Sequence, residues 1–159
     1  MEIYSKSAEF SQCRIYCYNL WRKWDENNHK YVMFIGLNPS TADEIQDDPT
    51  IRRCIQYSKD WGYGALCMTN LFAFRATQPK DMMAAIDPIG PMNDAHLLNL
   101  SKNAGIVVAA WGKEDGKFNE RDKQVLGLVQ NLHCLKLNKD GSPAHPLYLK
   151  KDLKPFLMN

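Results

Sequence analysis

The residues best suited to chemistry stand where four short apolar runs of the chain end. Most carry amides, hydroxyls or aromatic rings. They are Gly36, Leu37, Asn38, Pro39, Ser40 and Thr41 at the first run, Asn70, Phe72 and Arg75 at the second, Trp111 and Gly112 at the third, and His145 and Pro146 after the fourth. An amide presents a donor and an acceptor side by side, which suits the edge of a planar heterocycle, and aromatic faces stack on its plane. The set therefore predicts recognition of a nucleobase.

Several of these side chains also have a purely structural interpretation. Asn38, Ser40 and Asn70 are residue types that stabilise turns, and Trp111 is of a type that is usually buried. The functional interpretation is favoured because four segments that are separate in the sequence all end in such residues.

Charged residues follow the first run. Asp48 stands directly before Pro49, and this pair fits the N-cap and first position of a helix. Arg52 and Arg53 fall on the solvated face of that helix, close to an N-terminus that attracts phosphate. Arg75, which follows two aromatic residues, is the stronger candidate for binding phosphate.

The elements that must position these residues alternate along the chain. Short apolar runs predict buried strands over 31–37, 65–72, 105–112 and 133–138. Amphipathic or capped segments predict helices over 49–61, 78–86, 91–103 and 119–132. An aromatic-rich segment over 14–24 predicts one strand before these, and a short helix is expected at the C-terminus.

This alternation predicts an α/β fold, specifically a three-layer α/β/α sandwich. Its centre would be a mostly parallel four-stranded sheet, with one N-terminal strand in addition. The length of 159 residues fits a single domain over 1–159. Ligands bind such sheets beyond the carboxyl ends of the strands, so the four groups of residues are expected on one rim.

The composition argues against several classes of protein. A net charge of +2 gives no general basic field, and no apolar run approaches the roughly 20 residues of a membrane span. Five cysteines, an odd number, and the absence of an apolar leader predict reduced thiols in the cytoplasm. Their spacing does not suit a metal site. We therefore expect no metal, cofactor or membrane partner, and the oligomeric state stays open.

The motifs resemble those of known families. The runs LNPSTAD, DDPTIRRC, WGYG, NLFAFRAT, AAWG and HPLYL resemble the pattern of the bacterial and phage family called domain of unknown function 1643. More distantly, GLNPS, MTNLFAFR, VVAAWG and HPLYL resemble motifs of the uracil-DNA glycosylase superfamily.

The second resemblance implies roles for particular residues. Asn38 would position the attacking water, and Asn70 would read the edge of the base. His145 would donate to the base oxygen that gains charge as the bond to the sugar breaks. Arg75, with the loop over 142–147, would hold the nucleic-acid backbone.

The sequence departs from that superfamily at two points. Asn38 replaces the aspartate that activates water in the most active branch, so a general base must come from elsewhere, and Asp43, Asp47 and Asp48 are candidates. Ser40 replaces a glycine, and HPLYL lacks the Ser-Pro of the loop that enters the DNA minor groove.

The first hypothesis is therefore an N-glycosidic hydrolase that acts on a damaged or modified pyrimidine flipped out of DNA. One alternative is an enzyme for free nucleosides or nucleotides, which the modest net charge favours. The other is a non-catalytic module that binds nucleic acid or nucleotides, which the departures from the motifs favour.

Overall fold

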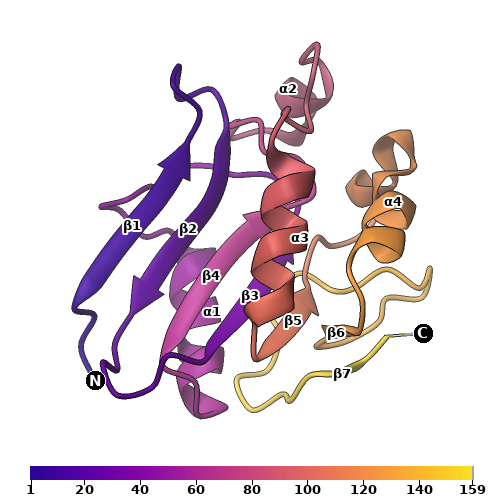
Figure 1. The fold of residues 1–159 in the computed structure, drawn as a ribbon. Helices are drawn as coiled ribbons and strands as arrows, with labels where there is room; N and C mark the ends of the chain where they lie inside the picture. The colour runs from indigo at the N-terminus through magenta and orange to yellow at the C-terminus, as the bar shows by residue number, and fades with distance from the viewer. Residues whose placement is uncertain (159) are drawn as a thin grey trace.

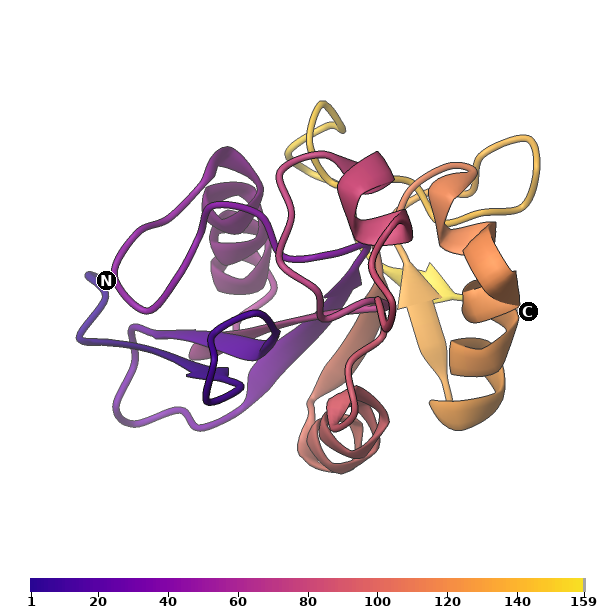
Figure 2. The ribbon, with the colours of Figure 1, turned by 90° about the horizontal axis from the view of Figure 1, so that it is seen from above.

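The computed structural model describes residues 1–158, in which one mixed sheet carries helices on both faces (Figures 1 and 2). The strands are β1 (Ser5–Phe10), β2 (Cys17–Lys23), β3 (Tyr31–Gly36), β4 (Ala65–Asn70), β5 (Ile106–Ala109), β6 (Leu132–Cys134) and β7 (Phe156–Leu157). The helices are α1 (Pro49–Asp60), α2 (Pro79–Met83), α3 (Asn93–Asn103) and α4 (Arg121–Leu128), with the 3-10 segment η1 (Asp115–Glu120).

The sheet has seven strands in the order β1-β2-β4-β3-β5-β6-β7. The neighbours β4, β3, β5 and β6 run parallel, while β1, β2 and β7 are antiparallel to their neighbours. The predicted α/β class is confirmed. The expected sheet of four strands plus one N-terminal strand, which is β2, is too small, because β1 and β7 extend it at its two edges.

Both missed strands lie at an edge. β1 has the sequence SKSAEF and is largely exposed, so it carries little of the apolar pattern by which a strand is recognised. β7 contributes only Phe156 and Leu157, which pair with β6. The helix expected at the C-terminus is wrong, since this segment completes the sheet instead.

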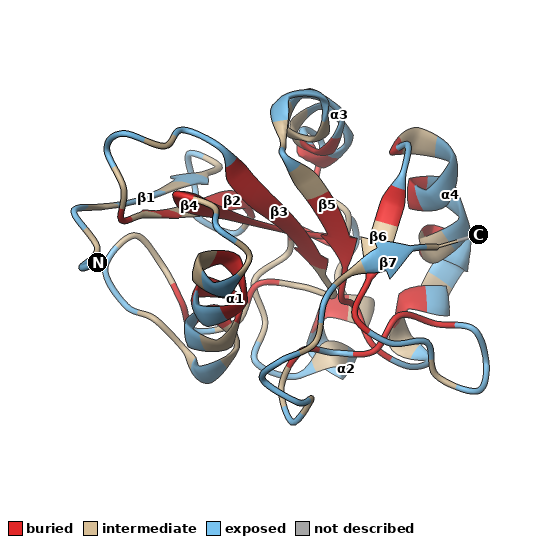
Figure 3. Cartoon of the chain, turned by 90° about the horizontal axis from the view of Figure 1, so that it is seen from below, coloured by how far each residue is buried: buried red, intermediate tan, exposed pale blue. Residues whose placement is uncertain are grey.

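Strand β3 packs on both faces, as its continuous apolar sequence predicts. Val32 and Phe34 lie in the same cluster of buried side chains as Ile51 of α1. Met33 and Ile35 point to the opposite face, into the cluster that contains Leu97 of α3 and Val125 of α4. Figure 3 shows this buried centre of the sheet between helices whose outer faces are exposed.

The chain reverses its direction of travel across the sheet after β4. From β3 it passes through α1 to β4 on one side, and then returns through α3 to β5 on the other side. When the connections from two neighbouring parallel strands leave in opposite directions, a crevice opens between the carboxyl ends of those two strands. The order β4-β3-β5 places that crevice between the ends of β3 and β5.

Helix α1 begins as its sequence predicts. The side chain of Asp48 accepts a hydrogen bond from the Ile51 amide at 2.8 Å, and Pro49 occupies the first turn. The helix ends at Asp60 with Trp61 as its C-cap, and Gly62 follows with a φ of +87°, which glycine adopts without strain. No helix within residues 1–158 has the length and apolar character needed to cross a bilayer.

Candidate functional site

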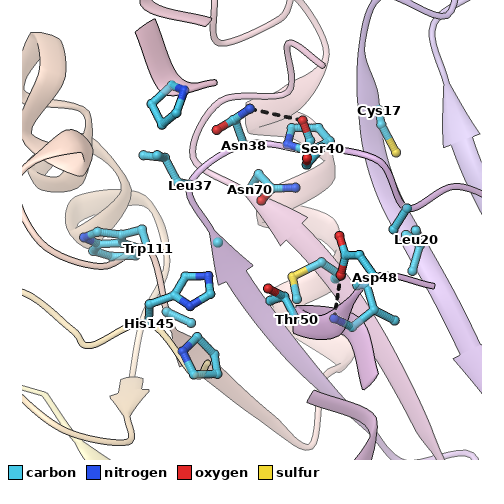
Figure 4. Close-up of a pocket in the computed structure, with 18 of the residues that line it drawn as sticks. Cys17, Leu20, Leu37, Asn38, Ser40, Asp48, Thr50, Asn70, Trp111 and His145 are labelled. Carbon is cyan, nitrogen blue, oxygen red and sulfur yellow. Dashed lines mark hydrogen bonds between the residues drawn. The ribbon is translucent and has the colours of Figure 1, made fainter. Parts of the chain in front are cut away.

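A cavity of about 330 Å³ opens at the carboxyl ends of the central strands. Its lining comes from β2, β3, the loop after β3, β4, α1, α2, the segment after β5 with η1, and the loop after β6 (Figure 4). The lining residues are Cys17, Leu20, Gly36, Leu37, Asn38, Pro39, Ser40, Ala42, Asp48, Thr50, Ile51, Met68, Asn70, Pro79, Ala110, Trp111, Asp115, His145 and Pro146. The cavity therefore lies at the crevice that the strand order creates.

The structure brings about half of the predicted site residues into this lining. Those that line it are Gly36, Leu37, Asn38, Pro39, Ser40, Asp48, Asn70, Trp111, His145 and Pro146. Those that do not are Thr41, Asp43, Asp47, Arg52, Arg53, Phe72, Arg75 and Gly112. The sequence did not indicate Cys17, Leu20, Ala42, Thr50, Ile51, Met68, Pro79, Ala110 and Asp115, most of which are apolar.

Gly36 makes room for the Asn70 side chain. The two residues are paired across β3 and β4, and a Cβ on Gly36 would stand 2.8 Å from Asn70 Oδ1. Asn70 is only 9% exposed, yet its side-chain amide has no hydrogen-bond partner within residues 1–158. An amide so placed can offer both its donor and its acceptor to a molecule in the cavity.

Two buried side chains fix the backbone around Asn70. The Asn93 amide donates to the carbonyls of Asn70 and Leu71, each at 3.0 Å. Arg121 donates from Nε to the Leu71 carbonyl at 2.9 Å and pairs with Asp94 at 2.6 Å. These bonds satisfy carbonyls at the point where the chain leaves the sheet, so the cavity wall is rigidly held.

The loop that carries His145 is attached to the end of β5. Gly112 has a φ of +82°, and its amide donates to the Pro143 carbonyl at 2.9 Å. Gly112 therefore supports the site without lining it. Its conformation favours glycine, because a side chain at this φ would be strained.

The His145 ring presents one N–H to the cavity. Its Nδ1 accepts a hydrogen bond from the Leu147 amide at 3.2 Å, so in the neutral ring the proton resides on Nε2. Although the residue is solvent-accessible, the surrounding protein atoms lower the pKa of His145 by desolvation, and the charge of Asp48 opposes this shift. His145 is therefore a neutral hydrogen-bond donor at pH 7.

The amide of Asn38 is oriented by the backbone. Its Nδ2 donates to the Ala76 carbonyl at 2.8 Å and to the Pro39 carbonyl at 3.0 Å. The oxygen Oδ1 then remains as the group that Asn38 can offer to a ligand or water. The Ala76 amide donates in return to the Pro39 carbonyl at 3.0 Å, which ties this turn to the segment after β4.

Asp43 and Asp47, both candidates for a general base, hold the loop after β3 together. The fully buried Arg22 donates to Asp47 Oδ1 at 2.7 Å, to the Asp43 carbonyl at 2.6 Å and to the Gln46 carbonyl at 3.0 Å. The Asp43 carboxylate accepts from the backbone amides of Gln46 and Ile45, which lowers its pKa. These two carboxylates are occupied and lie outside the cavity.

The carboxylates that line the cavity belong to Asp48 and Asp115. Asp48 uses one oxygen to cap α1, which leaves the other available. Asp115 begins the segment η1. Asp48 is therefore both the N-cap of α1 and part of the cavity wall.

The arginines considered for phosphate binding lie outside the cavity. Arg75 donates to the Arg14 carbonyl at 3.1 Å and stacks over the Phe10 ring at 4.8 Å. Arg53 donates to the Leu149 carbonyl at 2.7 Å. Arg52 is exposed on a shallow groove beside α1, where a phosphate outside the cavity could reach it.

The predicted aromatic stacking platforms are mainly core residues. Phe72 is fully buried against Phe118. Trp111 is only 3% exposed, and a side chain on Gly116 would collide with its indole ring. Trp111 therefore contributes one edge to the cavity wall. Thr41 is exposed beside the cavity.

Comparison with protein families identifies the chain. The model described as "Protein of unknown function (DUF1643)" matches residues 17–147. The chain belongs to this family. The match runs from the start of β2 to the loop of His145, so it includes the whole lining of the cavity. Searches of curated proteins and of solved structures gave no significant match.

Proposed function

We propose that the cavity binds a nucleobase and that the protein hydrolyses its N-glycosidic bond. One observation carries the proposal: the Asn70 amide and the His145 Nε2–H face a single cavity and have no partner within residues 1–158. The His145 ring is exposed to solvent and the Asn70 amide stands at the cavity wall, so water can satisfy both groups until a ligand replaces it. Polar groups that converge in one concave, mostly apolar site are typical of a ligand-binding site.

The arrangement of the central strands supports the same proposal. Four neighbouring parallel strands end at the rim that carries Asn38, Asn70 and His145, as the resemblance to uracil-DNA glycosylases implies. Under this proposal the domain is a glycosylase-like α/β/α sandwich whose sheet carries additional edge strands.

The proposed reaction breaks the bond between a ring nitrogen and C1′ of the sugar. Both electrons of that bond remain with the base, and the His145 N–H stabilises the base oxygen that gains negative charge. The Asn70 amide holds the edge of the base. The oxygen of a water molecule then adds to C1′, and the proton that it loses passes to a carboxylate and from there, through solvent, to the base nitrogen.

Asp48 is the strongest candidate for the group that accepts the water proton. It lines the cavity, whereas Asp43 and Asp47 are occupied in the loop after β3. Its negative charge also stabilises the positive charge that develops on the sugar. The Oδ1 atom of Asn38 would position the water.

A polynucleotide substrate fits the charges of the lining. Among residues 1–158, no lysine or arginine lines the cavity, while Arg52 and Lys151 lie on the exposed groove beside α1. This distribution of charge suits a base that enters the cavity while the phosphates of its strand stay outside. It suits the binding of a complete nucleotide inside the cavity less well. Nucleic acid is therefore the proposed partner.

A second candidate function is base binding without turnover. Asp48 has one oxygen committed to the helix cap, and the Asn38 nitrogen is committed to the backbone. A site whose reactive groups are partly occupied in this way can bind a base without activating water.

Base release distinguishes the two functions. The protein is incubated with single- and double-stranded oligonucleotides that carry uracil, mismatched thymine, hypoxanthine, xanthine or 5-substituted pyrimidines, and abasic sites are detected by alkaline cleavage. Asp48→Asn is the informative variant, because asparagine is an equally good helix N-cap. Loss of a general base should lower the rate by about 100-fold or more.

Asp60→Asn, at the end of the same helix, is the matched control for Asp48→Asn. His29→Gln is the matched control for His145→Gln. Release that survives in the controls and is lost in the Asp48 and His145 variants supports hydrolysis at this site. Release that is unchanged in both site variants would contradict it. Binding without any release, weakened by Asn70→Ala, would establish the second function.

A further inference from the structure

The cavity divides into a polar strip and an apolar recess. The strip consists of Asn38, Ser40, Asp48, Thr50, Asn70 and His145. The recess, as defined here, consists of Cys17, Leu20, Ala42, Ile51 and Met68. Figure 4 shows Cys17 and Leu20 on the side of Asn70 opposite Trp111 and His145.

The recess is built into the core of the protein. Leu20 and Met68 are cross-strand partners in β2 and β4, so their side chains emerge on the same face of the sheet. Both belong to the buried cluster that also includes Ala42 and Ile51. The five residues of the recess are each between 3% and 7% exposed, so their positions are fixed by packing.

The five side chains of the recess offer almost nothing for a polar group to bond. Four of its five side chains are hydrocarbon or thioether. The Cys17 thiol donates to the Asn19 carbonyl, with 3.6 Å between Sγ and the oxygen. Burial raises the pKa of this thiol to about 11, so it is uncharged at pH 7. A polar substituent placed there would lose its hydrogen bonds to water without replacement.

We propose that the recess receives an apolar substituent on the bound base. The substrate class would then be pyrimidines with a short alkyl or alkynyl group at C5, the carbon beside the edge that Asn70 contacts. This rests on the proposed function, since it requires the polar strip to bind a base. An unsubstituted base would leave the recess filled with water that has few hydrogen-bond partners.

The proposal predicts an order of affinities. Each buried methylene is worth about fourfold in affinity. A 5-ethyl group should therefore improve binding over uracil by about 15-fold, and a 5-methyl group by about fourfold. A 5-hydroxymethyl group, similar in size to ethyl but polar, should bind more weakly than 5-ethyl by tenfold or more.

The test is equilibrium binding to single-stranded oligonucleotides, each carrying one 2′-fluoro nucleotide that resists hydrolysis. The bases are uracil, thymine, 5-ethyluracil, 5-propynyluracil and 5-hydroxymethyluracil, and the readout is fluorescence anisotropy. Ala42→Leu fills the recess and should abolish the preference for 5-ethyluracil while uracil still binds. Ala42→Val is the milder variant if the leucine disturbs folding, which is checked by urea unfolding.

Failure of this proposal can be separated from failure of the proposed function. If Asn70→Ala weakens binding but all five bases bind equally well, or if 5-hydroxymethyluracil binds best, the recess has no such role and base binding stands. If no base binds in a manner that depends on Asn70, both proposals are overturned. The expected order of affinities, lost in the Ala42 variants, supports both.

Discussion

Two regions on the rim of the sheet use polar side chains in opposite ways. Beneath the loop after β3, Arg22 of β2 is fully buried and pairs with Asp47, and it also donates to the carbonyls of Asp43 and Gln46. In the cavity beside it, Asn70 and the Nε2 of His145 have no partner within residues 1–158.

The difference separates groups that hold the structure from groups that face a ligand. A buried charge without its partners is costly, so Arg22 must keep its bonds for the protein to fold. An amide at the wall of a water-filled cavity costs little, because water satisfies it until a ligand arrives. The two regions should therefore respond differently to substitution.

The largest effect is expected from breaking the loop. Arg22→Met removes the guanidinium and leaves Asp47, within the described part of the chain, with only the more distant Lys6, at 3.6 Å. The free energy of unfolding should fall by about 3–5 kcal/mol, measured by urea denaturation. Arg52→Met, on the exposed face of α1, is the control and should change stability by less than about 0.5 kcal/mol. Equal losses of stability in the two variants would contradict the structural role assigned to Arg22.

A smaller effect is expected where the two strands meet beneath the amide. In Gly36→Ala the new Cβ displaces Asn70 Oδ1, which can turn into the cavity, so the loss of stability should be about 1 kcal/mol. Base binding should weaken by about tenfold or more, since the amide no longer meets the base edge. Unchanged affinity in a variant of normal stability would argue against Asn70 as the reader of the base.

A still smaller effect on stability is expected when the unpartnered amide itself is removed. Asn70→Ala deletes no hydrogen bond within residues 1–158, so the free energy of unfolding should change by about 0.5 kcal/mol or less. The affinity for a base should nevertheless fall by about tenfold to 100-fold. Asn27→Ala, in an exposed turn, is the control. A large loss of stability with normal binding would assign Asn70 to the scaffold.

The smallest effect is a dependence of stability on pH. The pKa of His145 is lowered below its ordinary value of 6.5, so the unfolded chain binds more protons than the folded chain between these two pKa values. This contribution to stability is complete above pH 6.5 and is lost as the pH falls below it. In His145→Gln the urea midpoint should depend less on pH between 5 and 7. An unchanged dependence of the midpoint on pH would show that this histidine is not its cause.

Much of the scaffold follows from local sequence. The buried strands around β3, β4 and β5 and the start of α1 at Asp48 are encoded in apolar runs and a capping pair. β1 and β7 are not encoded in the local sequence, because they form by pairing with a neighbouring strand. The end of α4 at Leu128 was also missed, since the apolar pattern continues through Val129 into β6.

The site was predictable only for residues that directly follow a strand. Asn38, Asn70 and His145 could be assigned to one rim because parallel strands end together. The role of Asp47 could not be foreseen, because it depends on Arg22, which lies more than 20 residues earlier in the chain. The Asp43 carboxylate instead bonds the nearby amides of Ile45 and Gln46, a local turn that the sequence analysis did not consider. Leu20 and Met68 read as ordinary core residues, and only the cross-strand pairing brings them to the cavity.

The most direct test is a crystal structure of the protein with an oligonucleotide that carries one non-cleavable 2′-fluoro pyrimidine. We predict that the base lies in the cavity, with the Asn70 amide and His145 Nε2 each within about 2.7–3.2 Å of its polar atoms. A base bound elsewhere, or one in the cavity that leaves both groups without a hydrogen bond, would contradict the account.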